Sequence, residues 1–225
     1  MTEQEWLASV EPGGMLRLLR DNGSDRKLRL FACACCRQVW HFLTDRRCRA
    51  AVEQAERYAD GQASKRGLTP VRVAAREAVR REDLPYWRKR AFHACLKVVE
   101  DRPAPEVAGG AAIAASGAVV CKPSNRGGYK TSRAAQAALL RDLFSPFRPV
   151  RPGPAWQTPQ VVALAEAAYE QRELPAGTLD PARLTVLADA LEDAGCADAD
   201  LLGHLRAPGP HVRGCWALDL LLCRG

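Results

Sequence analysis

The sequence has no alternating apolar–polar run long enough for a half-buried β-strand. It also lacks the run of about 18 apolar residues that a membrane-spanning helix requires. The longest mildly apolar stretch, residues 107–121, is mostly Ala and Gly and is too short. The opening residues, MTEQEWLASVEPGG, have neither a basic nor an apolar segment of the secretory type. We therefore expect an all-α protein with no membrane partner, no secretory signal and a cytoplasmic location.

The composition is that of a folded protein, with 47% hydrophobic and 26% charged residues among 225. Its nine cysteines are odd in number and two are adjacent, which does not suit a small secreted disulfide scaffold. Cys33 and Cys36 lie one helical turn apart, so they are able to share a ligand face. However, the surrounding segment is apolar throughout, which favours buried and unreactive thiols. We expect most cysteines to be core residues.

Charge is distributed unevenly along the chain. Residues 1–151 contain 28 Lys and Arg against 16 Asp and Glu, whereas residues 152–225 contain 5 against 10. A basic body followed by an acidic region suits binding to an acidic partner, or attraction between the two parts.

Apolar periodicity and capping signals predict a bundle-like array of helices. The predicted helices lie near 25–43, 45–60, 70–81, 85–102, 131–144, 158–172, 181–194, 198–206 and 212–223. Three regions follow: a basic helical region (1–102), a Gly- and Ala-rich connection of low periodicity (103–130) and a C-terminal helical region (131–225). A proline-rich linker interrupts the last region at SPFRPVRPGPAW. Whether the two helical regions pack as one domain stays open.

The C-terminal segment contains the most specific group of candidate ligands, Cys196, His204, His211 and Cys215. Two thiols and two imidazoles are a sufficient donor set for tetrahedral zinc. The C-x7-H-x6-H-x3-C spacing matches no common zinc finger, although His211 and Cys215 would share one face of a helix. Zinc is therefore one hypothesis for a cofactor, and structural packing of these residues is the other.

The same corner also allows an interpretation without metal. The Pro208-Gly209-Pro210 turn predicts a rigid bend before the last helix. Arg213 and Trp216 would then lie near that helix start, as an anion- or partner-binding pair. A salt bridge from Arg213 to one of the acids at 189–200 explains the arginine at least as well.

Basic and aromatic residues are interleaved over 72–102, which suits phosphate contact and base stacking. The candidate nucleic-acid-binding residues are Arg72, Arg76, Arg80, Arg81, Trp87, Arg88, Lys89 and Arg90. Glu77, Glu82 and Asp83 dilute this charge, so a solvated helix face is an equal alternative.

Three stretches are similar to a family of paralogous proteins, of unassigned activity, that is abundant in planctomycete bacteria. They are MTEQEWLASVEPGGMLRLLR with SDRKLRLFACACCRQVW, then AALLRDLFSPFRPV, then LADALEDAGC with PGPHVRGCW. The resemblance covers about the first sixty residues and most of the chain after Ala134. It implies a reusable binding or regulatory module and supplies no catalytic residues.

No residue set in the sequence predicts catalysis, so we do not expect an enzyme. The favoured function is a non-enzymatic helical interaction or regulatory module with a protein partner. Nucleic-acid binding through the 72–102 face and zinc binding through the C-terminal Cys/His group are the alternatives.

Overall fold

The computed structural model describes residues 1–80, 84–122, 128–147 and 153–224. Over these residues the chain is all-α, as predicted, and forms no sheet. The β-type backbone pairings among the described residues are two isolated bridges, from Thr178 to Glu173 and from Thr178 to Val212. No described helix combines the length and hydrophobicity that crossing a bilayer would take. The backbone divides into two compact units, Met1–Leu140 and Arg141–Gly225.

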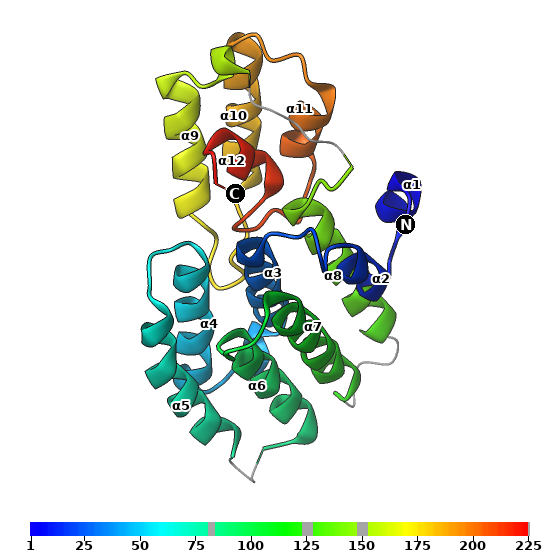
Figure 1. Ribbon diagram of the computed structural model, residues 1–225, viewed down its shortest axis with the longest axis vertical. Coiled ribbons are helices and arrows are strands. Elements are labelled where there is room, and N and C mark those ends of the chain that lie inside the picture. The colour runs from blue at the N-terminus through cyan, green and yellow to red at the C-terminus, as the bar shows by residue number, and fades with distance from the viewer. Residues whose placement is uncertain (81–83, 123–127, 148–152, 225) are drawn as a thin grey trace. The chain divides into compact units, whose positions relative to one another are not determined.

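The first unit is built from seven helices and most of an eighth. They are α1 (Glu3–Ala8), α2 (Pro12–Leu18), α3 (Asp25–Gln38), α4 (Arg46–Ala59), α5 (Leu68–Val79), α6 (Tyr86–Val98), α7 (Ala104–Val120) and α8 (Gly128–Leu143), with short 3₁₀ turns η1 (Trp40–Phe42) and η2 (Lys65–Gly67). Helix α3 packs against α4, α6 and α7 (Figure 1). The predicted central helix is therefore confirmed as a central element.

Burial explains why the middle of α3, residues 30–36, is apolar on all sides. Its residues Leu28, Phe31 and Cys35 are completely buried, and even Arg37 lies in the interior. The Arg37 guanidinium donates two hydrogen bonds to Glu56 on α4, at 2.6 and 2.8 Å. This bidentate pairing compensates two charges that would otherwise be strongly unfavourable in a core.

Helix α7 corrects the prediction of a low-periodicity connection over 103–130. Alanine is the best helix former, and the alanines of this segment are buried on most sides of α7. A helix that is buried on most sides has no polar stripe, so its sequence shows no amphipathic period. At Gly117 a Cβ atom would lie 2.5 Å from the Arg90 side chain, so glycine leaves room for this arginine against α7.

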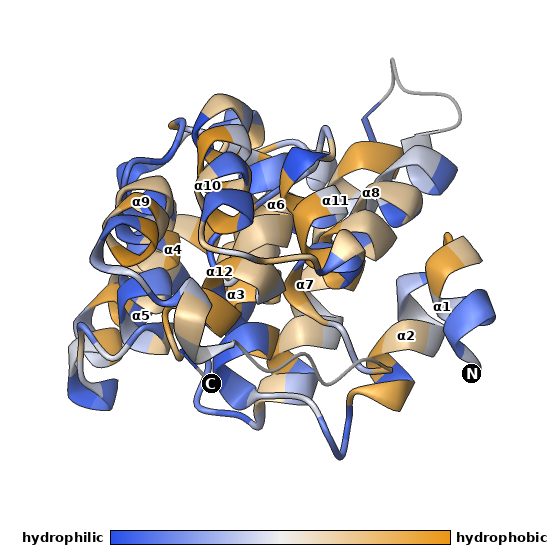
Figure 2. Ribbon diagram, turned by 90° about the horizontal axis from the view of Figure 1, so that it is seen from above, coloured by the Kyte–Doolittle hydropathy of each residue, from blue (hydrophilic) through white to orange (hydrophobic). Residues whose placement is uncertain are grey.

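The second unit contains α9 (Pro159–Glu170), α10 (Pro181–Asp193), α11 (Ala199–Arg206) and α12 (Trp216–Leu221), with a 3₁₀ turn η3 (Pro154–Trp156). Helix α10 packs against α9 and α11, and it carries both hydrophilic and hydrophobic turns (Figures 1 and 2). Its Leu184, Leu187 and Leu191 are completely buried in a core shared with α9, α11 and α12. The unit begins at Arg141 rather than at the predicted residue 131. Part of the predicted linker, residues 148–152, lies outside the described residues.

Enlarging a buried alanine of α7 tests whether this segment is packed helix. Ala111 is 0% exposed, so Ala111→Leu is expected to lower the free energy of unfolding by about 1–3 kcal/mol through overpacking. Ile113 on the same helix is 62% exposed, so Ile113→Ala is expected to change it by less than about 0.5 kcal/mol. Urea unfolding followed by circular dichroism measures both. Equal stability of the two variants would contradict a packed α7.

Candidate metal centre

Four potential metal ligands meet within the second unit. Asp142 lies in the last turn of α8, and His204 lies on α11. His211 belongs to the loop between α11 and α12, and Cys215 is the N-cap residue of α12. One donor atom from each of these side chains lies within 4.8 Å of all the others. Such a group can hold a metal ion.

Helix α11 is held in place by a cap at its first turn and by two buried leucines. The Asp198 side chain accepts hydrogen bonds from the backbone N–H groups of Asp200 and Leu201, which caps the first turn. Leu201 and Leu205 are buried in the core of the second unit. Because residues three and four apart share a helix side, these anchors leave His204 at the edge of the core.

The loop that carries His211 is fixed by its backbone. The His211 carbonyl accepts a hydrogen bond of 2.8 Å from the N–H of Leu179, and Val212 forms a bridge with Thr178. Gly214 has a φ of 91°, a conformation that favours glycine, and it turns the chain into α12. Residues 211–215 are therefore a turn, and the prediction that His211 and Cys215 share a helix face is wrong. The turn brings them together instead.

A single carboxylate oxygen lies at the centre of the group. Asp142 Oδ1 lies 2.8 Å from His211 Nδ1 and 3.2 Å from His204 Nε2. His204 Nε2 also lies 3.2 Å from Cys215 Sγ. The side chains of Asp142 and His211 are only 3% and 2% exposed, and that of His204 is 18% exposed. Water therefore has little access to these polar atoms.

The remaining polar atoms of the group have partners that orient the ligands. The N–H of Val212 donates to Asp142 Oδ2 at 2.8 Å, which directs Oδ1 toward the histidines. His211 Nε2 lies 3.0 Å from the carbonyl oxygen of Ala207. Backbone partners of this kind fix the tautomer and ring orientation of metal-binding histidines.

These contacts place both ring nitrogens of His211 against acceptor atoms. A neutral imidazole has one N–H and one lone pair. If Nε2 donates to Ala207, the lone pair on Nδ1 faces the Asp142 carboxylate. A proton or a metal ion between Nδ1 and Oδ1 makes that contact favourable.

The pKa values of the group follow from burial and mutual charge. Burial acts to raise the pKa of Asp142, but hydrogen bonds with His204 and His211 outweigh it, so this pKa lies below its usual value. Burial acts to lower the pKa of His211, yet the hydrogen bond and charge of Asp142 raise it overall. Burial, and then the charge of Asp142, raises the pKa of Cys215 well above its usual value. Without metal, these directions favour a charged Asp142 carboxylate beside a protonated His211 and a protonated Cys215 thiol.

The structure brings together three of the four predicted ligands and replaces the fourth. Cys196 is not part of the group; it is buried beside Glu192 and Arg206, at the junction of α10 and α11. Asp142 takes its place, although it is separated from His211 by 69 positions in the sequence. The signal that could have identified it is a carboxylate between the buried Leu140 and Leu143 of an amphipathic helix.

The second predicted pair, Arg213 and Trp216, forms internal contacts. Arg213 donates to Glu170 at 2.7 Å and its guanidinium lies 5.1 Å from the centre of the Tyr169 ring. Its partner is thus on α9 and not among the acids at 189–200. The Trp216 ring packs against His204, with ring centres 4.8 Å apart. Neither residue is presented as an open anion site.

The predicted nucleic-acid residues are divided between two helices. Arg72, Arg76 and Arg80 lie on α5 or at its end, while Trp87, Arg88, Lys89 and Arg90 lie on α6; Arg81 lies outside the described residues. Trp87 packs edge-on against Phe42, with ring centres 4.8 Å apart, and Arg90 donates to the Ile113 carbonyl. Trp87 and Arg90 thus contact other residues of the same unit.

The predicted core role of the cysteines agrees with their burial. Seven of the nine are buried, and the exceptions are Cys121 and Cys223. For Cys33, Cys35 and Cys36, burial is the largest cause of a pKa well above the usual value. Thiols in this state are poor nucleophiles.

Comparisons of the chain with protein-family models, curated proteins and solved structures gave no match. The class of the protein therefore rests on its own features: an all-α fold and a buried Asp/His/His/Cys group. The resemblance to the planctomycete family stays a prediction.

Removing the central carboxylate tests the account of the metal-free group. Asp142→Ala leaves the N–H of Val212 and the His211 ring without their buried partner, so the free energy of unfolding is expected to fall by about 3–5 kcal/mol. Asp193→Ala, at an exposed position on α10, is expected to change it by less than about 0.5 kcal/mol. Urea unfolding in the presence of a chelator measures both. An Asp142→Ala effect as small as that of the control would contradict this account.

Proposed function

We propose that this chain is a metal-binding helical protein, in which Asp142, His204, His211 and Cys215 hold a zinc ion. The observation that carries the proposal is the convergence of two imidazole nitrogens and a thiol around one buried carboxylate oxygen. Buried polar atoms that face one another in this way are stabilised by a proton or a metal ion between them, and a divalent metal would serve all four side chains at once.

The donor set favours zinc among the common metals. Imidazole and thiolate together select a borderline-soft ion, whereas magnesium and calcium prefer oxygen ligands. In a tetrahedral zinc site, neighbouring donor atoms lie about 3.3–3.6 Å apart, given the usual Zn–N and Zn–S bond lengths. The three shortest separations, 2.8 and 3.2 Å, would have to lengthen slightly, and the other pairs, which lie within 4.8 Å, would have to approach or keep the tetrahedral distance.

Four protein ligands and their burial favour a structural role for the metal. Catalytic zinc sites keep one position open for water, whereas structural sites are closed by four protein ligands. The ion would join the end of α8, helix α11 and the start of α12, which belong to one compact unit. Metal-binding free energy then stabilises that unit directly. We propose that this metal-stabilised scaffold serves as a non-enzymatic interaction or regulatory module with a protein partner.

Metal analysis of matched cysteine variants tests this function. Protein purified without an affinity tag is expected to contain about one zinc ion per chain, and Cys215→Ser is expected to lose most of it. Cys196→Ser is the matched control, because Cys196 lies in the same unit and outside the group, and it is expected to keep its zinc. Inductively coupled plasma mass spectrometry measures the content.

Thermal unfolding provides a second readout of the same proposal. A chelator is expected to lower the Tm of the parent protein and of Cys196→Ser, and to leave that of Cys215→Ser nearly unchanged. Absence of zinc from the parent after incubation with the metal, or equal zinc in both variants, would overturn the proposal.

A further inference from the structure

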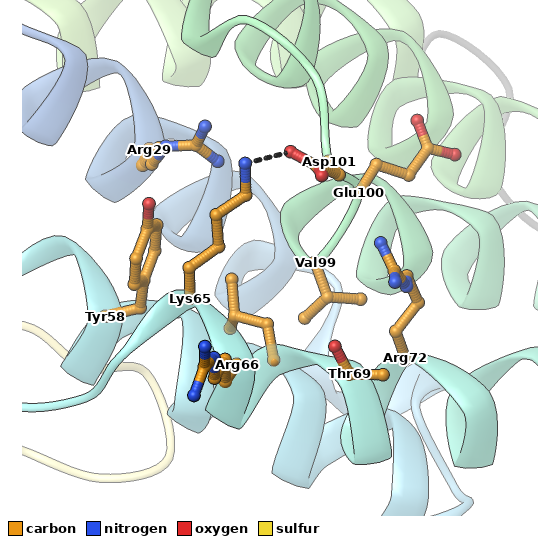
Figure 3. Close-up of a pocket in the computed structure, with 10 residues that line it drawn as sticks. Arg29, Tyr58, Lys65, Arg66, Thr69, Arg72, Val99, Glu100 and Asp101 are labelled. Carbon is orange, nitrogen blue, oxygen red and sulfur yellow. Dashed lines mark ion pairs between the residues drawn. The ribbon is translucent and has the colours of Figure 1, made fainter.

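The first unit contains a pocket that is separate from the metal centre. Its volume is about 380 Å³. Lysine and arginine side chains from α3, η2 and α5 line one part of it, and the residues after α6 line another. Figure 3 shows the nitrogen ends of Arg29 and Lys65 facing Asp101, with Arg72 approaching from the side of Glu100. Tyr58, Leu68 and Val99 supply apolar surface.

The two carboxylates of the pocket already have cationic partners. Asp101 pairs with Lys65 at 2.6 Å. Glu100 pairs with two residues that do not line the pocket, Lys97 at 3.0 Å and Arg102 at 3.3 Å. The pocket is thus lined by four cationic and two anionic side chains, and both anionic side chains already form salt bridges.

The arginines of the pocket have no such close partner. Within the described residues, no salt bridge joins Arg29, Arg66 or Arg72 to an acidic side chain, and the charges of Arg72 and Arg29 act on Asp101 only from a longer distance than that of Lys65. Arg29 donates to the backbone carbonyl of Arg102 at 3.0 Å and its guanidinium lies 5.4 Å from the Tyr58 ring centre. These contacts orient Arg29, and neither of them supplies a negative charge. The pocket therefore has an excess of positive charge around a concave surface.

We propose that this pocket binds a small phosphorylated molecule, independently of the metal centre. Guanidinium groups match the geometry of phosphate oxygens and bind them through paired hydrogen bonds. Lys65 would add a further donor by exchanging Asp101 for the phosphate, since this ion pair is largely exposed and therefore weak. The Tyr58 ring and Val99 would contact the organic part of the ligand.

The pocket suits a small molecule better than a nucleic-acid strand. Its volume lies within the range of about 300–1,000 Å³ that is usual for small-ligand sites. The three arginines come from three different elements, α3, η2 and α5, and their side chains line the same pocket. They do not form a row along one face. A strand would need such a row to follow its backbone.

Calorimetric titration with ADP and with inorganic pyrophosphate tests the proposal. Both probes are expected to bind the parent protein, and Arg72→Ala is expected to weaken each by about tenfold, because a charged hydrogen-bonding partner is lost. Arg76→Ala is the matched control, since Arg76 is exposed on the same helix and does not line the pocket. It is expected to bind like the parent.

A gain-of-binding variant separates recognition from general damage. Asp101→Asn removes a negative charge and frees Lys65, so it is expected to bind both probes more tightly than the parent. No binding of either probe at millimolar concentration would overturn the proposal. So would equal weakening by Arg72→Ala and Arg76→Ala, or binding of a single-stranded oligonucleotide that depends equally on both arginines. Those last two results would assign the charge to an extended nucleic-acid face.

Discussion

The buried carboxylate of Asp142 determines the arrangement of the second unit's ligand group. An unpaired charge at this depth would be strongly unfavourable, so the chain must bring donors to both of its oxygens. The backbone N–H of Val212 serves one oxygen, and His211 and His204 face the other. The path of the loop between α11 and α12 follows from this requirement, because the loop supplies two of these donors. The same loop places Cys215 at the start of α12.

The geometry around Asp142 suits either a proton or a metal ion between its carboxylate and His211. With a proton, His211 is the cation of a buried ion pair, and the raised pKa of Cys215 keeps its thiol neutral. A divalent ion would replace that proton and stabilise the thiolate, so the group would gain a fourth ligand on metal binding. The contact of His211 with the Ala207 carbonyl suits both states, since Nε2 donates in each. The apo arrangement is therefore already close to the proposed bound one.

The sequence predicted the long helices whose burial follows a helical period, and it missed the short helices α1 and α2 and the helix α7, which has no such period. Helix α3 was identified from its wide apolar stripe, whereas α7 was not, because small buried alanines on most of its sides leave no period. His204, His211 and Cys215 were grouped correctly because they lie close in the sequence. Asp142 was missed because only the tertiary fold brings α8 to them, and Cys196 was included because proximity in sequence does not fix the direction of a side chain.

The central claim is that zinc is bound by one thiolate, two imidazoles and one carboxylate. X-ray absorption spectroscopy at the zinc edge of the loaded protein tests it most directly, because sulfur is readily distinguished from nitrogen and oxygen. The account predicts one sulfur ligand at about 2.3 Å and three nitrogen or oxygen ligands at about 2.0–2.2 Å. Two sulfur ligands would show that Cys196 or another thiol takes the place of Asp142 or of one histidine, and a spectrum without sulfur would exclude Cys215. Either result would contradict the assigned site.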